Sequence, residues 1–254
     1  MHPLKAHPAL SFFISVFLFF QMSKSYSDIV ILNGPPGSGK GTQAKDIARY
    51  LDYPLLSLGT LTRSGLTDVS VSDSLSLSLP DQKERNLQKQ KVVISWLQSQ
   101  QEKSGMISDG WPRRKHAIDS FFSFVKSSDH RVLVFRLHID DDQILTERAR
   151  SRKVCPDPQC ASSWGRLIRP PDPDICSCGK VLKTRFFDSQ DRFIKRIQKY
   201  RKMNKEDPFK DYANEPWFTL IEIPGDQSPG SVRQEIFKYL KRWKTSGQKQ
   251  FSID

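Results

Sequence analysis

The sequence predicts a three-layer α/β domain with a central parallel sheet, and two kinds of observation lead to this prediction. Residues 28–33 are apolar and β-branched, and they are followed at once by a glycine-rich turn and a segment with helical periodicity. Further stretches of strand length that contain apolar residues occur at 106–109, 131–137 and 218–223. Buried strands that alternate with helices are typical of a parallel sheet covered on both faces.

The first strand leads into residues 34–42 (GPPGSGKGT), which have the form of a phosphate-binding loop, or P-loop. The glycines let the backbone curl around an anion with its N–H groups pointing inward, and the following helix adds the positive end of its dipole. Lys40 supplies a mobile positive charge for the outer phosphates. The alternative is a plain glycine-rich turn with an unrelated lysine, which the flanking strand and the spacing disfavour. The residues expected to contact phosphate are Gly34, Pro36, Gly37, Ser38, Gly39, Lys40, Gly41 and Thr42.

The remaining elements follow from periodicity. A helix is expected directly after the loop, from Thr42 to Leu51, and a short strand near Leu55. The strand at 106–109 ends in Asp109, an acid at the carboxyl end of a strand beside a phosphate loop. Further helices are expected at 83–103, 140–152, 190–202 and, as a closing amphipathic helix, from Val232 to Trp243.

Composition leaves the class of partner open. The 254-residue chain has a formal net charge of +12 and 37% hydrophobic residues. Such a charge suits nucleic acid, a membrane surface or a site for several phosphates. No block of five like charges occurs, so a polybasic tail is not expected.

Residues 1–27 form an N-terminal extension outside the predicted domain. The stretch from Ala9 to Phe20 carries no charge, yet it is shorter than the roughly 20 residues that span a bilayer. It resembles the apolar core of a signal peptide. Three interpretations are open: a secretory signal, a membrane-associated extension, or translated upstream sequence with the start at Met22. We favour Met22, because it leaves a short polar lead into the first strand.

The phosphate-binding loop departs from the general pattern, in which Ser or Thr directly follows the lysine. Gly41 occupies that position, and the hydroxyl comes one residue later, at Thr42. This form is similar to the loop of the adenylate kinase family, within the nucleoside monophosphate kinases. The stretch from Asp109 to Arg113 (DGWPR) resembles the family's Asp-Gly-Phe-Pro-Arg. The resemblance covers residues 28 to about 243. It implies that this chain is a divergent member of the bacterial long-lid type.

The resemblance implies ATP as the donor and AMP as the acceptor. Two arginines, Arg63 and Arg113, are implied to clamp the acceptor phosphate. The family's adenine-reading Gln is replaced by Ala117 and a nearby Thr by Leu58, so CMP, UMP or a broader set of acceptors remains an alternative. The implied acceptor-binding residues are Ser57, Leu58, Gly59, Arg63, Gly110, Arg113, Ala117, Arg185 and Arg196.

On the donor side, the resemblance implies that Arg148 lies against the adenine of ATP and that Arg152 reaches its phosphates. The turn containing Asp226 is also implied to face the adenine. Asp109 is implied to hold Mg²⁺ through water. Catalysis would depend on positioning and charge neutralisation, without a protein nucleophile. The implied catalytic residues are Lys40, Arg113, Arg152, Arg185 and Arg196.

The cysteines of the chain form one cluster in sequence: Cys155, Cys160, Cys176 and Cys178. Such clustering indicates a zinc knuckle, and it resembles the zinc-bearing lid of many bacterial adenylate kinases. The spacing, C-x4-C and C-x-C, departs from the family's C-x2-C pairs, and a single intervening residue makes it harder for both thiolates to reach one ion. A disulfide pair and reduced thiols are the alternatives.

The predicted organisation is a P-loop kinase domain at 28–243, with an acceptor-binding insert at 57–86 and a lid insert at 153–188. A mobile tail is expected at 244–254. Residues 67–79 alternate between apolar and polar, which favours a strand, whereas the family implies a helical insert.

We expect the ligands to be ATP with Mg²⁺ and a nucleoside monophosphate. No nucleic acid partner and no stable membrane association are expected, and the protein is expected to be a cytoplasmic monomer. The rival outside enzymes is a divergent nucleotide-binding module with weak or no turnover that uses its basic surface on nucleic acid. The retained lysine and arginines argue against that rival.

Overall fold

The computed structural model describes residues 28–57, 105–127, 130–157, 160, 162–185 and 188–246. The predicted N-terminal extension and nearly all of the acceptor-binding insert, with its alternating segment at 67–79 and the helix expected at 83–103, therefore lie outside the described residues. The same holds for 247–254 at the end of the chain.

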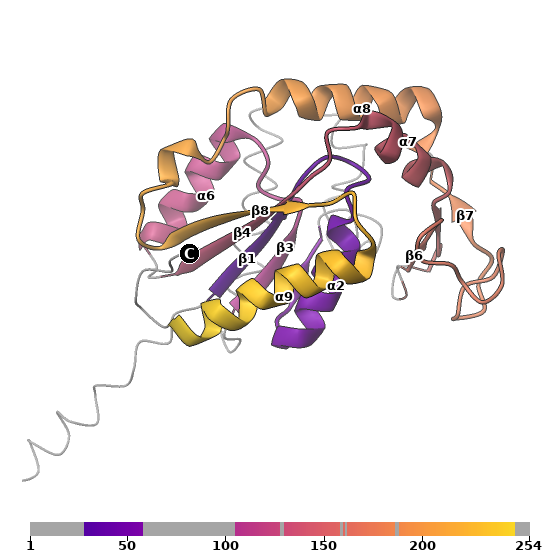
Figure 1. The fold of residues 1–254 in the computed structure, drawn as a ribbon, viewed down its shortest axis with the longest axis horizontal. Coiled ribbons are helices and arrows are strands. Elements are labelled where there is room, and N and C mark those ends of the chain that lie inside the picture. The colour runs from indigo at the N-terminus through magenta and orange to yellow at the C-terminus, as the bar shows by residue number, and fades with distance from the viewer. Residues whose placement is uncertain are drawn as a thin grey trace, which may run out of the picture.

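A five-stranded parallel sheet forms the centre of the domain (Figure 1), as predicted. The strands are β1 (Asp28–Asn33), β2 (Leu55–Leu56), β3 (Gly105–Asp109), β4 (Arg131–His138) and β8 (Phe218–Pro224), in the order β2-β3-β1-β4-β8. Their registers place Leu32 beside Asp109 on one side and beside Phe135 on the other. The carboxyl ends of β1, β3 and β4 therefore meet at one edge of the sheet.

One face of the sheet is covered by α2 (Lys40–Leu51) and α9 (Pro229–Ser246) (Figure 1). Val30 and Leu32 of β1 point to this face, where they join a cluster that includes Ile47 of α2. The helix α2 begins inside the phosphate-binding loop, two residues earlier than predicted. The helix α9 continues to Ser246, three residues beyond the predicted end of the domain.

The other face is covered by α6 (Lys115–Ser127), which the sequence analysis did not predict. Ile29 and Ile31 of β1 point to this face, because side chains alternate along a strand. The signal for α6 was present in the sequence, since buried Ile118, Phe121, Phe122 and Val125 have helical spacing. The sheet and its two helical faces confirm the predicted three-layer fold.

Two further helices flank the insert predicted at 153–188, which is called the lid below. The helix α7 (Asp142–Arg150) precedes the lid and α8 (Gln190–Met203) follows it, and the two pack through Leu145, Phe193 and Ile197. The side chain of Asp141 caps α7 by accepting a hydrogen bond from the backbone N–H of Gln143 at 2.7 Å.

The lid contains a small antiparallel sheet of three two-residue strands, which was not predicted. They are β5 (Lys153–Val154), β6 (Ser163–Trp164) and β7 (Lys183–Thr184), in the order β6-β5-β7. This sheet stands at the ends of α7 and α8, beside the main domain (Figure 1). A single 3₁₀ turn, η2 (Lys210–Tyr212), comes between α8 and β8.

Candidate nucleotide-binding site

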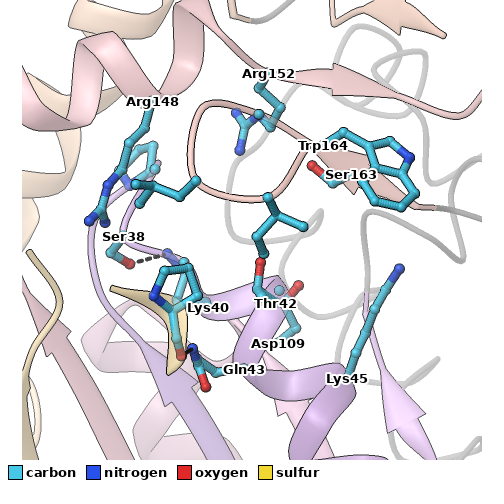
Figure 2. Close-up of a pocket in the computed structure, with 18 of the residues that line it drawn as sticks. Ser38, Lys40, Thr42, Gln43, Lys45, Asp109, Arg148, Arg152, Ser163 and Trp164 are labelled. Atoms are coloured by element: carbon cyan, nitrogen blue, oxygen red, sulfur yellow. Dashed lines mark hydrogen bonds between the residues drawn. The ribbon is translucent and has the colours of Figure 1, made fainter. Parts of the chain in front are cut away.

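A cavity of about 650 Å³ lies at the carboxyl edge of the sheet, between the phosphate-binding loop and the lid (Figure 2). This volume lies in the usual range for sites that hold small molecules. The described lining is strongly basic, with Asp46 and Asp109 as its acids against nine cations. These cations are Lys40, Lys45, Arg49, Arg113, Arg148, Arg152, Arg166, Arg185 and Arg196. A cavity of this size and charge suits a ligand that carries several phosphates.

Lys40 lies at the bottom of the cavity and is held by the loop itself. Its Nζ donates to the carbonyl oxygens of Gly34 and Pro35 at 2.8 and 2.7 Å, and it lies 3.4 Å from Ser38 Oγ (Figure 2). These contacts hold the amino group within the loop that is expected to bind phosphate.

The electrostatic setting lowers the pKa of Lys40 to about 7. Removal from water is the main cause, and the positive charges of Arg113, Arg196 and Arg152 act in the same direction, while Asp109 opposes them. A phosphate in the loop would supply the negative charge that the cluster of cations lacks.

Gly34 shows why the loop requires glycine. Its φ is +142°, and a Cβ built there would lie 2.4 Å from the carbonyl oxygen of Leu137. Any side chain would therefore separate the loop from the end of β4, so Gly34 shapes the site although it does not line the cavity.

Asp109 ends β3 and faces the first turn of α2 across the cavity floor. Its Oδ2 would lie 3.2 Å from a Cβ at Gly41, so the absence of a side chain there leaves room for the carboxylate. The predicted acid at the end of a strand is thus placed beside Lys40 and the loop.

Two of the predicted arginines meet on one buried carboxylate. The side chain of Asp188 is fully buried; it accepts from Arg152 Nε and Nη2 at 2.7 and 2.6 Å, and from Arg196 Nη1 at 3.3 Å. Arg152 follows α7 and Arg196 lies on α8, so Asp188 ties the two connections of the lid together. Because this carboxylate fixes both guanidinium groups, they are oriented before any ligand binds.

Arg148 has a structural partner in the turn that follows β8. Its guanidinium group donates to the carbonyl oxygens of Gly225, Asp226 and Gln227 at 2.7, 3.1 and 3.3 Å. The side chain also lines the cavity (Figure 2). Arg148 therefore fixes the wall against which the donor adenine was predicted to lie.

The lid contributes residues that the sequence analysis missed. Trp164 and Arg166 line the cavity, and Figure 2 shows Trp164, Arg148 and Arg152 facing the loop residues across the open space. Arg166 Nη1 lies 3.0 Å from Glu147 Oε2 on α7. Gln43, also missed, lines the cavity and donates to the carbonyl oxygen of Pro229 at 2.9 Å. Trp164 and Arg166 are identified only by contacts between distant segments, whereas Gln43 directly follows the phosphate-binding loop and carried that signal in the sequence.

Most of the predicted site residues that the structure describes come together in this cavity. Those that line it are Pro36, Gly37, Ser38, Gly39, Lys40, Gly41, Thr42, Ser57, Asp109, Gly110, Arg113, Arg148, Arg152, Cys155, Arg185 and Arg196. Asp226 and Ala117 are absent from the lining: Asp226 takes part through its carbonyl oxygen, and Ala117 is buried on α6. Leu58, Gly59 and Arg63 lie outside the described residues.

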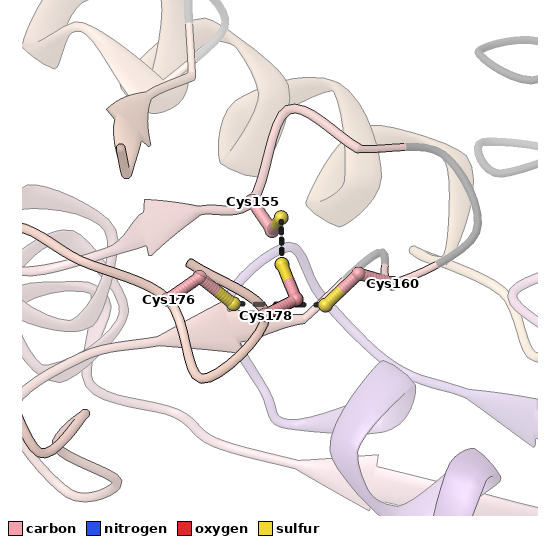
Figure 3. A group of neighbouring side chains, drawn as sticks. All are labelled: Cys155, Cys160, Cys176 and Cys178. Carbon is pink, nitrogen blue, oxygen red and sulfur yellow. Dashed lines mark hydrogen bonds between the residues drawn. The ribbon is translucent and has the colours of Figure 1, made fainter. Parts of the chain in front are cut away.

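The four cysteines form a compact group in the lid (Figure 3). Their sulfur atoms all lie within 4.8 Å of one another, with Cys155 and Cys178 at 3.4 Å and Cys160 and Cys176 at 3.6 Å. All four are free thiols. The C-x-C spacing therefore does not prevent convergence, because each member of that pair faces a cysteine from the other pair.

The chain is similar in sequence to known proteins over most of its length. A sequence model described as an AAA domain matches residues 33–159. The chain is 30% identical to an adenylate kinase of Caldanaerobacter subterraneus subsp. tengcongensis, over 83% of this chain and 95% of that protein. It is 31% identical to one of Thermoanaerobacter sp., over 83% and 97%, and 28% identical to one of Methanococcoides burtonii, over 85% and 99%.

The parallel sheet, the phosphate-binding loop and the basic cavity define a P-loop kinase, an ATP-dependent phosphotransferase. Sequence identities of 30% and 31% over most of both chains show the family: the protein belongs to the adenylate kinase family. The resemblance inferred from the loop and the DGWPR motif is thereby confirmed, as is the divergent character of the chain. Among the described residues, no helix is long and apolar enough to cross a membrane.

Proposed function

We propose that this protein catalyses the reversible transfer of the γ-phosphoryl group of ATP to AMP, giving two molecules of ADP. The observation that carries the proposal is the convergence of Lys40, Asp109, Arg113, Arg152 and Arg196 around one cavity at the end of the sheet. They come from four separate segments, and each brings a charge that phosphoryl transfer uses. The named activity of the relatives supports the same reaction.

On the donor side, the loop would bind the ATP phosphates through its backbone N–H groups, with Lys40 at the outer phosphates. Arg148 and the turn at 225–227 would position the adenine. No side chain needs to form a bond with the phosphoryl group, because holding the donor and acceptor oxygens in line supplies most of the rate enhancement.

The charge that develops on the transferred group would be neutralised by the arginines of the lid connections. Arg152 and Arg196, which both pair with Asp188 and both line the cavity, would approach it together. Arg185 lines the same cavity and would join them. Closure of the lid would exclude water, which would otherwise accept the phosphoryl group.

The residues fit a magnesium ion carried in with ATP. Asp109 presents a carboxylate to the cavity, and the missing side chain at Gly41 leaves space beside it. Hard oxygen ligands suit Mg²⁺, which usually keeps several of its waters. Asp109 would hold the ion through such a water, and the ion would shield the negative charge of the phosphates when bound.

We also propose that the four cysteines bind a structural zinc ion. Zn–S bonds of about 2.3 Å in a tetrahedron place sulfur atoms about 3.8 Å apart, and the paired sulfurs at 3.4 and 3.6 Å come close to this value. The lid has three strands of two residues each and a small apolar cluster around Cys155, Cys176 and Leu182. A metal would therefore supply much of the stability of the lid.

A kinase with a broader choice of acceptor is the second candidate. Ala117, which stands where the family has its adenine-reading Gln, is buried on α6 and does not line the described cavity. Its methyl group cannot hydrogen-bond a base edge. Arg113, which would clamp the acceptor phosphate, does line the cavity and would serve any nucleoside monophosphate equally.

The test is a coupled assay of the purified protein with Mg·ATP against AMP, CMP, UMP, GMP and dTMP. We expect AMP to be phosphorylated at a rate typical of kinases, roughly 1–100 s⁻¹, and the Lys40→Ala variant to be slower by about a hundredfold or more. A folded wild-type protein that binds ATP and phosphorylates none of the five would overturn the proposal in favour of a nucleotide-binding module.

A further inference from the structure

A basic and aromatic surface lies where α9 ends, beside the last turn of α2. We define the α9–α2 face by Tyr50, Phe237, Lys238, Lys241 and Lys244. The rings of Tyr50 on α2 and Phe237 on α9 stack with their centroids 4.6 Å apart, and Lys244 Nζ lies 5.9 Å from the centroid of the Tyr50 ring. Tyr50 remains 40% exposed although its ring has a stacking partner.

The charge of this face has one sign. The side chains of Lys238, Lys241 and Lys244 are exposed, and no acidic residue follows Glu235 in α9. The spacing of three residues between successive lysines places them on neighbouring positions of one helix surface. The opposite surface, with Ile236 among its residues, is buried against the sheet. The helix α9 is therefore amphipathic, with a cationic outer side.

The chain enters the domain beside this face. Asp28, the first residue of β1, forms an ion pair with Arg131 Nη2 at 2.8 Å. The guanidinium group of Arg131 in turn lies 4.4 Å from the ring centroid of Trp243, near the end of α9. The sequence that precedes Asp28 includes the uncharged stretch from Ala9 to Phe20, which contains five phenylalanines. The described part of the chain therefore begins close to the end of α9.

We propose that the α9–α2 face docks on the surface of a membrane that contains anionic lipids. Lysines near such a surface each contribute about fivefold to affinity, and aromatic side chains with a polar edge favour the headgroup region. Stable attachment usually needs two signals, a basic patch and an apolar group, because either alone binds weakly. The lysines supply the first signal and the stretch at 9–20, where it is present, supplies the second.

A nucleic acid fits this face less well. Single strands bind through bases that stack on free aromatic faces, interleaved with cations. The Tyr50 ring is stacked on Phe237 and has Lys244 near its centroid, so the ring offers its hydroxyl edge rather than an open face. A surface of lipid phosphates needs no stacking and matches a row of lysines.

The site of phosphoryl transfer stays accessible in this arrangement, since none of the five residues of the α9–α2 face lines the cavity. The proposal changes the expectation of no stable membrane association, which rested on sequence alone. The contact of Arg131 with Asp28 and with Trp243 places the start of the described chain near the end of α9. The proposal is independent of the acceptor that the enzyme uses.

The experiment measures binding to vesicles by co-sedimentation, with protein expressed from Met1 and from Met22. The vesicles contain phosphatidylcholine alone or with about one third phosphatidylserine, at low ionic strength. The test variant is the triple substitution Lys238→Gln, Lys241→Gln and Lys244→Gln. The matched control is Lys195→Gln, Lys199→Gln and Lys202→Gln, which removes the same charge from exposed positions of another basic helix, α8.

We expect binding only with phosphatidylserine, tighter for the protein from Met1 than for that from Met22. The α9 triple variant should lose about a hundredfold in affinity, and the α8 control less than about fivefold. Kinase activity in solution should be unchanged in both variants. Equal losses in the two variants would overturn the proposal, because net charge alone would then explain binding. A protein that binds no vesicles would also overturn the proposal, whether or not the α9 lysines bind single-stranded RNA.

Discussion

The carboxylate of Asp109 lies against the backbone of Gly41, so that a Cβ at Gly41 would stand 3.2 Å from Asp109 Oδ2. This relationship explains why the loop departs from the general pattern at this position. A Ser or Thr directly after Lys40 would crowd the carboxylate, whereas Thr42, one residue later, lines the same cavity. The hydroxyl therefore comes two residues after Lys40 instead of one because β3 closely approaches the first turn of α2.

The first prediction concerns Gly41→Ala. Glycine inside a helix costs about 1 kcal/mol relative to alanine, so the melting temperature should be unchanged or raised. Activity should fall, because the added methyl displaces Asp109 by a few tenths of an ångström; we expect about a tenfold loss in kcat. Thermal unfolding and the coupled assay measure the two effects.

The control for this prediction is Gly230→Ala, in the first turn of α9. A Cβ at Gly230 would meet only Ser228 Oγ, at an ordinary 3.8 Å. This variant should gain stability without losing activity. A Gly41→Ala enzyme with wild-type kcat would show that the position of Asp109 is unimportant for the reaction.

The second prediction is proton uptake on ATP binding. The pKa of Lys40 is lowered to about 7 in the free protein, chiefly by burial, so the side chain is mostly neutral at pH 8. Bound phosphates favour the charged form and raise its pKa. The complex should therefore take up close to one proton between about pH 7.5 and 9, and little below pH 6, where Lys40 is already charged.

Calorimetry of binding of a non-hydrolysable ATP analogue, in buffers that differ in ionisation enthalpy, measures this uptake. Lys40→Arg provides the control, because an arginine stays charged throughout and should abolish the effect. Uptake that persists in Lys40→Arg would assign the proton to another group.

The third prediction concerns Asp188→Asn. The substitution removes the charge that compensates Arg152 and Arg196 while keeping the shape of the side chain. We expect a loss of about 1–3 kcal/mol in the free energy of unfolding, at the lower end because the arginines are partly exposed. Because bound phosphates supply the missing negative charge, ATP should raise the melting temperature more in the variant than in the wild type.

Asp174→Asn is the matched control for Asp188→Asn. Asp174 is an exposed acid of the lid that pairs with Lys153 at 2.5 Å. Exposed pairs contribute little, so this variant should match the wild type in stability and activity. If Asp188→Asn also matched the wild type in stability and activity, the two arginines would not depend on that carboxylate.

The fourth prediction is one zinc ion per chain. Metal analysis of protein purified under reducing conditions should give about one equivalent, and chelation should lower the melting temperature. Replacing Cys176 by Ser should abolish the zinc content, whereas Ser177→Ala, between the two ligands of the C-x-C pair, should retain it. Protein that carries no metal and has four titratable thiols would rule out the zinc site.

Most strands of the large sheet were predictable because they contain a run of apolar residues, such as 29–32 and 132–135, that fits a buried strand. The lid sheet was not, because its two-residue strands carry no periodicity and depend on the convergence of the cysteines. The helix α6 carried a clear pattern from Ile118 to Val125 but was not predicted. Helical periodicity is therefore present in the sequence of a helix that buries a whole face, α6 included, and it is absent from the lid strands, which tertiary contacts impose.

The candidate site also has a part that the sequence predicts and a part that it does not. The phosphate-binding loop was predictable because its function is local: backbone N–H groups, a glycine turn and Lys40 lie within nine consecutive residues. The pairing of Arg152 with Asp188, 36 residues apart, and the contact of Gln43 with Pro229 were not, since they depend on how distant segments meet. The roles assigned to Leu58, Gly59 and Arg63 remain predictions from the family resemblance.

The last prediction concerns the choice of acceptor. Ala117 replaces the Gln that reads adenine in the family, and its burial on α6 leaves no polar atom there to contact a base edge. Each lost hydrogen bond to a base removes about 1–3 kcal/mol of discrimination, whereas Arg113 binds the phosphate whatever the base. We therefore expect kcat/KM for AMP to exceed that for CMP or UMP by less than about a hundredfold.

The neighbouring His116 is exposed on α6 and offers the one alternative reader of the base in this turn. If it takes that role, AMP preference should be higher in the wild type and should fall in His116→Ala. Replacing Ala117 by Gln should raise the preference for AMP in either case, provided that the longer side chain reaches the acceptor. A preference for AMP above about a thousandfold that survives His116→Ala would mean that a contact elsewhere reads the adenine, since neither residue of this turn could then account for the discrimination.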